Sequence, residues 1–254
     1  MQNYVYPVFT TGRVLKKESI ENIRDFPRDL LDVFYADYSD GIICGFDVTY
    51  NARKLYISGG ALKNDGKIIV LKDASCDFNE FGENIWVRLR LGETQETEDF
   101  LTVGVEIKIT RDSGAAANEI ELARFRLAEG ALLRKKNEYR GVSDFITRDN
   151  TLNLVHVKYS GLYSPTFSPV LMKVFAKEIL RVSQDGADIA FAFICLNGNI
   201  VHKDCIVQYL NNRLNAAFGE NISNAEIYEA LIDVTRKQNA APVKRKIGGP
   251  SISG

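Results

Sequence analysis

Apolar and polar residues alternate in three stretches in the first half of the chain. Ile85–Leu91 has an apolar residue at every second position, and Leu101–Ile109 and Glu119–Leu127 repeat the pattern. A period of two is typical of a strand with one buried face, so each stretch is predicted to be a β-strand. The acidic segment Glu93–Asp99 is predicted to be a solvated hairpin loop between the first two.

The segment Ser39–Leu71 combines short β-rich runs with turn residues. It predicts one strand ending at Gly45 and three more at Phe46–Tyr50, Lys54–Ser58 and Ile68–Leu71. Turns are expected at 51–53 and 63–66, with a break at Gly59-Gly60, because Asn and Gly tolerate positive φ. These turns carry no phosphate loop and no cluster of metal ligands.

A helical leader precedes the strands. Apolar residues spaced by three and four predict an amphipathic helix within Lys16–Tyr38, namely Ile20, Ile23, Phe26, Leu30, Leu31 and Phe34. Pro27 lies in the middle of this pattern, and proline interrupts helices, so two short helices are expected instead of one.

The second half of the chain is helical in character. Helices are predicted at Val170–Val182, at Lys203–Phe218 ending at Gly219, and at Ala225–Thr235 ending near Arg236. Ser168-Pro169 is an N-terminal signal for the first, and Ser223 to Glu226 reads as a capping box for the last. The apolar run Ile189–Leu196 fits a buried strand or a buried helical turn equally well.

Together these patterns predict an α+β fold with a β-rich N-terminal half and an α-helical C-terminal half. The expected organisation is a leader at 1–40, a β-rich domain at 41–127, a charged, solvated junction at 128–150, an α-rich domain at 151–237 and a flexible tail at 238–254. The tail contains Pro242 and a Gly/Ser-rich end, so a partner would be needed to order it.

A resemblance rests on the glycine pattern of the first 75 residues. The phrases DGIICGFDV at 40–48 and LYISGGALKNDGKII at 55–69 resemble the start of phage tail-fibre, baseplate and fibre-adaptor proteins. The upstream FTTGRVL at 9–15 fits the same kind of leader. The resemblance implies a structural role in a tail or contractile injection system, and a homo-oligomer, commonly a trimer.

Composition narrows the possible partners and cofactors. The 254 residues carry a formal net charge of −1, which gives no overall attraction to nucleic acid or anionic membrane. Neither a membrane span nor a signal peptide is visible, so synthesis in the cytoplasm is expected before assembly into a virion or tail-like particle. The four cysteines and two histidines are scattered, so reduced thiols, no metal site and no cofactor are predicted.

Candidate catalytic groups are isolated from one another. Ser58 lacks a Gly-x-Ser-x-Gly context, and His202 and Cys205 fit a helix-cap region with a buried thiol better than a nucleophile. Carboxylates near turns, Asp37, Asp40 and Asp47, are usually solvated. The sequence therefore predicts no enzyme, with an uncharacterised hydrolase as the third alternative.

The function predicted from the sequence is a structural component of a phage tail or contractile tail-like particle, in the baseplate or attaching a fibre. Its partners would be other tail or baseplate proteins and its own copies, with tail contacts at Val243, Lys244, Arg245, Lys246, Ile247 and Ile252. The second alternative is a receptor- or carbohydrate-binding β module. Its stacking residues would be Trp86, Tyr50, Tyr56 and Tyr163, although Trp86 inside a strand is more often a core residue.

Overall fold

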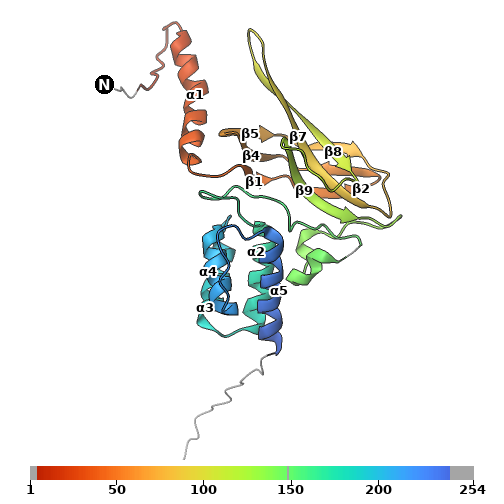
Figure 1. Cartoon of the computed structure of the whole chain (residues 1–254). Helices are drawn as coiled ribbons and strands as arrows, with labels where there is room; N and C mark the ends of the chain where they lie inside the picture. Colours follow the sequence, from red (N-terminus) through yellow and green to blue (C-terminus); the bar gives the residue numbers. More distant parts are fainter. Residues whose placement is uncertain (1–4, 148, 241–254) are drawn as a thin grey trace, which may run out of the picture.

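The computed structural model describes residues 5–147 and 149–240. Within this range an N-terminal helix is followed by three three-stranded antiparallel sheets and then by four helices (Figure 1). The predicted α+β fold, with strands in the first half and helices in the second, is confirmed.

Two small sheets are built from interleaved strands of residues 41–77. Strands β1 (Gly41–Gly45), β4 (Gly60–Asn64) and β5 (Lys67–Leu71) form one, and β2 (Val48–Asn51), β3 (Lys54–Ile57) and β6 (Ala74–Asp77) form the other. Both predicted turns are two-residue turns with positive φ, at Ala52-Arg53 and Asp65-Gly66. The predicted strand start at Phe46 is wrong because Phe46 itself has a φ of 57°, so β2 begins at Val48.

The third sheet has the order β8-β7-β9, with β7 at Asn84–Glu96, β8 at Leu101–Thr110 and β9 at Glu119–Arg126. The three strands were predicted, but the predicted loop at Glu93–Asp99 begins too early. Pairing of β7 with β8 continues to Glu96 opposite Leu101, so the turn is confined to residues 97–100. The hairpin projects beyond the sheet as a long arm (Figure 1).

The second half contains α2 (Pro169–Val182), α3 (Gly186–Asn197), α4 (Lys203–Leu214) and α5 (Asn224–Ala240). The open alternative at Ile189–Leu196 resolves to a helix, α3. Helix α4 ends earlier than predicted because Asn215 adopts the left-handed conformation that terminates helices. Helix α5 runs past Arg236 to Ala240, since backbone hydrogen bonding continues a helix without an apolar stripe.

The predicted capping box at the start of α5 is present. The backbone N–H of Ser223 donates to Glu226 Oε2 at 2.8 Å, and the N–H of Glu226 donates to Ser223 Oγ at 3.2 Å. At α2, Ser168 is the N-cap residue as predicted, but its side chain makes no capping hydrogen bond. The position of a cap is therefore easier to predict than its bonds.

The junction 128–150 contributes to the core, which its charged sequence did not predict. Four of its side chains are buried, Leu133, Tyr139, Val142 and Phe145, around two short 3₁₀ helices, η1 (Lys136–Glu138) and η2 (Val142–Ile146). Tyr228 of α5 donates a hydrogen bond from its hydroxyl to the Val142 carbonyl at 2.6 Å. Buried apolar residues thus form one cluster through sheets, junction and helices. The five-part division of the chain stays a prediction.

Candidate assembly surface

Helix α1, Lys17–Phe34, is one continuous 18-residue helix that contains Pro27. The prediction of two short helices is therefore wrong. A proline inside a helix removes one backbone donor and crowds the carbonyl group four residues earlier, which costs stability but can kink a helix instead of ending it. Good helix formers lie on both sides of Pro27, Arg24 before it and Arg28, Leu30 and Leu31 after it, and they favour continuation of the helix.

The apolar face of α1 is exposed to solvent. None of the helix's residues is buried, and the helix stands beside the edge strand β5 with its first turns extending beyond the sheet (Figure 1). Between 41% and 67% of the surface of each apolar face residue is accessible, for Ile20, Ile23, Phe26, Leu30, Leu31 and Phe34. Half of a large side chain is roughly 100 Å², so the face exposes on the order of 600 Å².

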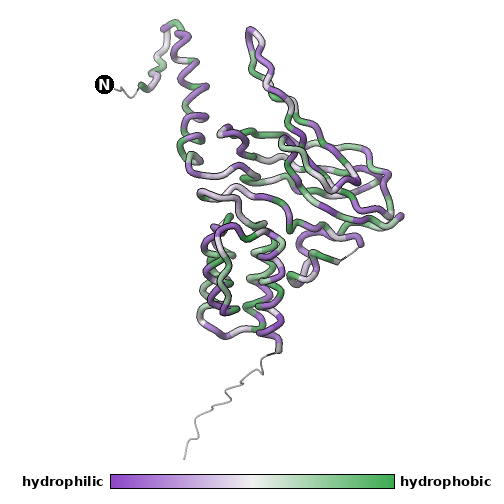
Figure 2. The backbone as a smooth tube through the Cα atoms, viewed as in Figure 1, coloured by the Kyte–Doolittle hydropathy of each residue, from purple (hydrophilic) through white to green (hydrophobic). Residues whose placement is uncertain are grey.

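The segment before α1 enlarges this surface. Residues 5–15 have no helix or strand, and they expose Val5, Tyr6, Val8, Phe9, Val14 and Leu15. The side-chain amide of Asn22 donates to the Val5 carbonyl at 3.3 Å, so the segment runs back beside the helix. We call the apolar side chains of 5–34 the leader surface. Hydrophobic and hydrophilic residues alternate along the backbone of this segment and of α1 (Figure 2).

The leader surface concentrates the exposed apolar residues of the chain. Among the described residues, 13 of the 22 large hydrophobic side chains that are exposed lie between Val5 and Phe34. A typical soluble monomer has no contiguous apolar patch beyond about 300–600 Å². A patch of this size on a single projecting element indicates an interaction site.

A buried lysine fixes the root of α1 to the sheet. Lys63 of β4 is 7% exposed, and its ammonium donates to the carbonyl oxygens of Tyr35, Ala36 and Tyr38 at 2.6, 3.0 and 2.7 Å. These carbonyls lie at and just after the C-terminal end of α1, where a cation offsets the partial negative charge of the helix. The helix is thus held at one end while its apolar face stays open.

Charged residues occupy the opposite face of α1 and pair with each other. Lys17 Nζ lies 3.4 Å from Oε1 of Glu21, one helical turn later. Arg24 donates two hydrogen bonds to Asp25, at 2.7 and 2.8 Å. The hydrogen bond from Arg24 lowers the pKa of Asp25 below its ordinary value. The pair four residues apart, Lys17 and Glu21, supports the helix, and these contacts leave its apolar face uncovered.

A cleft lies at the root of α1, between the sheet and the helices. It has a volume of about 590 Å³ and is lined by Phe34, Tyr38, Cys44, Lys173 and His202, among others. His202 Nδ1 accepts a hydrogen bond from the Leu162 N–H at 3.3 Å, and its ring lies 6.4 Å from that of Tyr38. The cleft therefore continues the exposed apolar residues of α1 toward α2.

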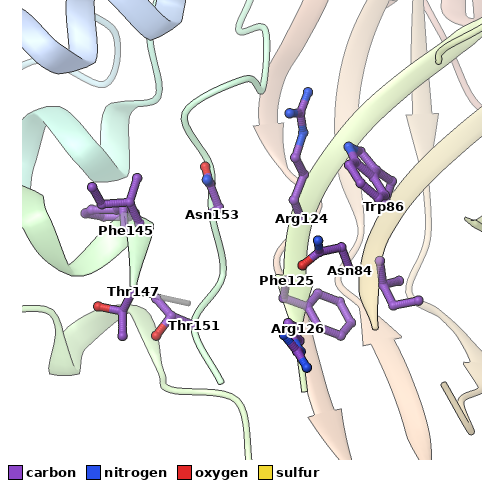
Figure 3. Close-up of a pocket in the computed structure, with 11 residues that line it drawn as sticks. Asn84, Trp86, Arg124, Phe125, Arg126, Phe145, Thr147, Thr151 and Asn153 are labelled. Atoms are coloured by element: carbon purple, nitrogen blue, oxygen red, sulfur yellow. The ribbon is translucent and has the colours of Figure 1, made fainter. Parts of the chain in front are cut away.

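A second cleft, of about 280 Å³, contains the one tryptophan (Figure 3). Trp86 lies on β7 beside Arg124, and the guanidinium carbon of Arg124 is 5.7 Å from the centre of the indole ring. Asn153 and Phe145 face them from the other wall (Figure 3). A sugar ring would have to displace Arg124 to stack on this face of the indole.

The tyrosines of the carbohydrate alternative do not join Trp86 in a row. Tyr50 pairs with Leu55 and Tyr56 with Thr49, so the two tyrosines point to opposite faces of their sheet. Tyr50 packs against Phe78 and Phe81, while Tyr163 lies in a loop and is 77% exposed. The structure does not bring these four side chains together.

The candidate catalytic groups also have local partners. Ser58 Oγ accepts the Asp47 N–H at 2.9 Å, Asp40 accepts the Asp65 N–H at 3.1 Å, and Asp47 forms an ion pair with Lys136. Burial raises the pKa of the Cys205 thiol, which disfavours a thiolate near His202. The part of the chain that the structure describes contains no group of three or more potential metal-ligating side chains.

The remaining sequence predictions about partners fall outside the described residues. The tail residues Val243, Lys244, Arg245, Lys246, Ile247 and Ile252 all lie beyond residue 240.

Over 5–147 and 149–240, no helix is long and apolar enough to cross a membrane. The four cysteines are free, and burial raises the pKa of Cys195 to about 12.

Comparison with known proteins gives structural neighbours and no family. No family model and no curated protein matches the chain. A crystal structure of TssK aligns at a TM-score of 0.40 and 11% identity, over 93% of this chain and 69% of that one. Two further matches are the TssK-TssF-TssG baseplate subcomplex of the type VI secretion system and the baseplate complex of that system. Both align at a TM-score of 0.40 over 94% of this chain. The subcomplex chain is 8% identical and 99% of its length is covered, and the chain of the baseplate complex is 10% identical and 100% of its length is covered.

Proposed function

We propose that this chain is a structural assembly component of a contractile tail-like particle, in its baseplate or at the attachment of a fibre. The observation that carries the proposal is the leader surface, a projecting helix with its apolar face open to solvent. In this role the folded body positions α1, and α1 docks on a neighbouring component of the particle. The glycine pattern at 40–69, which resembles tail and baseplate proteins, supports the choice of particle.

The chemistry of the chain agrees with a positional role. Lys63 holds the end of α1 by three hydrogen bonds, so the helix is presented in a defined direction. Helix-in-groove recognition uses apolar residues at spacings of three and four, which is the spacing of Ile20, Ile23, Phe26 and Leu30. The partner would accordingly offer an apolar groove with polar rims.

Localisation in the particle tests this proposal. Tail-like particles are purified from cells that carry the native gene and from cells in which it is deleted. The proposal predicts that mass spectrometry finds the chain in the particle fraction, and that its deletion leaves tubes or sheaths without complete baseplates in electron micrographs. Normal particles from the deletion strain, or a chain absent from wild-type particles, would rule it out.

A further inference from the structure

Helix α3 has a second apolar face that nothing in the described part of the chain covers. The sequence of Ile189–Leu196 is the most apolar run of the chain, and it predicts burial. In the structure Phe191, Ala192 and Cys195 are buried, but Phe193 and Ile194 are 54% and 49% exposed. With Ala190, three of the eight residues of this apolar run are therefore exposed to solvent.

The exposed face of α3 contains no charged residue. Its exposed side chains lie within about a third of the helix circumference, given 100° per residue, and they are Ala187, Ala190, Phe193, Ile194 and Asn197. The one charged residue of α3, Asp188, is fully buried. It accepts a hydrogen bond from the Tyr209 hydroxyl at 2.8 Å and pairs with Arg213 at 2.9 Å, so its charge is held inside the bundle.

The neighbouring helix α4 exposes mainly uncharged polar side chains. The two helices pack through Phe191 and Tyr209, whose rings are stacked with centres 3.9 Å apart. Exposed residues of α4 include Gln208 and Asn212, and Asp204 at its first turn is its one exposed charge. Helices α2 and α5, which lie beside α3 and α4 in Figure 1, expose charged residues instead, namely Lys177, Arg181, Glu229, Asp233 and Arg236.

We infer that the α3 face, defined as Ala187, Ala190, Phe193, Ile194 and Asn197, binds the α3 face of a second copy of this chain. Near a rotation axis each residue of a contact meets its own counterparts, so any charge there would face a like charge. A face without charges meets itself without that penalty. The small residues Ala187 and Ala190 let two helices approach closely, with Phe193 and Ile194 filling the remaining space.

The area of the α3 face agrees with a small contact between copies. The exposed parts of the α3 face amount to roughly 300–400 Å² per copy, about half of the ~800 Å² that each partner contributes to a standard interface. A contact of this size is at the small end of protein–protein interfaces, so we expect the association to be weak. The α3 face lies in the helical half, apart from the leader surface, so either inference can fail without the other.

Opposite charges at one position give the direct test. Wild type, Phe193→Glu and Phe193→Lys are studied separately and as an equimolar mixture of the two variants, by sedimentation velocity of the full chain from 1 to 200 µM. We expect wild type to associate, each variant alone to associate at least tenfold more weakly, and the mixture to regain association. Rescue by mixing is specific to a contact in which position 193 lies near itself.

Ile23→Glu is the matched control, because Ile23 is 53% exposed, close to the 54% of Phe193, and lies on α1. Circular dichroism checks that every variant is folded. Retained association in Ile23→Glu, together with rescue in the mixture, supports the inference, whether the assembly is a dimer or a trimer. A monomeric wild type at 200 µM, or Phe193 variants that associate as wild type does, or folded variants that the mixture fails to rescue, would overturn it.

Discussion

Arg88 and Glu119 form an ion pair inside the β7–β9 sheet, with Nη1 and Oε2 3.3 Å apart and both side chains fully buried. Arg88 also donates to the carbonyl oxygens of Asp112, Ser113 and Gly114 at 2.9, 2.9 and 2.6 Å. The arginine therefore ties the loop after β8 to the sheet. It is the largest fully buried side chain of the described residues, and its aliphatic stem also fills core volume.

Removing Arg88 should destabilise the fold. In Arg88→Met the three loop carbonyls lose their donor and Glu119 loses one of its cations, so we expect the free energy of unfolding to fall by about 3–5 kcal/mol. Urea denaturation followed by circular dichroism measures the change. The control is Arg111→Met, which removes an exposed ion pair with Glu80 and should change the free energy of unfolding far less, because exposed ion pairs contribute little. Equal effects of the two substitutions would contradict the role given to Arg88.

The stability of the chain should decrease in acid through Glu119. Its carboxylate accepts a hydrogen bond from Lys108 at 2.6 Å and further bonds from Arg90 at 3.0 and 3.2 Å, and together these lower its pKa from 4.5 to about 2. A lowered folded-state pKa gives stability above the unfolded value, and that stability is lost as the pH falls from about 4.5 toward 2.

The measurement is the melting temperature of wild type and Glu119→Gln between pH 7 and pH 2.5. Wild type should lose stability more steeply than the variant below pH 4.5, because the amide has no proton to take up. The variant should also melt at a lower temperature at pH 7, where it lacks the carboxylate. Parallel curves for the two proteins would show that Glu119 is not the group responsible.

Gly45 and Gly60 lie opposite each other in β1 and β4, and neither position has room for a side chain. A Cβ at Gly45, where φ is 78°, would lie 2.2 Å from the Gly59 carbonyl oxygen, and one at Gly60 would lie 2.5 Å from the Cys44 oxygen. Gly45→Ala is expected to lower the free energy of unfolding by about 3 kcal/mol or more, through strain and displaced backbone.

The control separates the positive φ from the close contact. Gly66 has a similar φ of 71°, but a Cβ at this position would meet no atom within 4 Å, so Gly66→Ala should cost only about 1–2 kcal/mol. Thermal melts of both variants give the comparison. A Gly45→Ala protein as stable as Gly66→Ala would mean that β1 and β4 can separate without cost.

The sequence predicted the elements whose signals are local. Alternation identified the strands at 85–91 and 101–109, and turn residues located Asp65-Gly66, because these signals depend only on neighbouring residues. The glycines at 45, 59 and 60 also stood out, although their reason, two backbones in contact, required the structure. The length of α1 was not predicted, because Pro27 alone suggested a break between two short helices.

Burial could not be predicted in the same way. The spacing of Ile20, Ile23 and Phe26 identifies an apolar face, but spacing carries no information about whether another element covers that face. The same holds for Phe193 and Ile194, whose apolar run predicted burial that the described part of the chain does not provide. Conversely, the charged junction hides Tyr139 and Phe145, which are buried by residues distant in the sequence.

The central claim, that α1 docks the chain in a particle, is tested most directly by incorporation of Ile23→Glu. Arg28→Gln on the polar face of α1 is the matched control, since it changes the net charge by the same −1. Both variants should melt within about 2 °C of wild type, because surface substitutions cost little. Each is expressed in the deletion strain, and the chain is quantified in purified particles. We predict normal incorporation of Arg28→Gln and at least a tenfold loss for Ile23→Glu; equal incorporation of the two folded proteins would contradict the account.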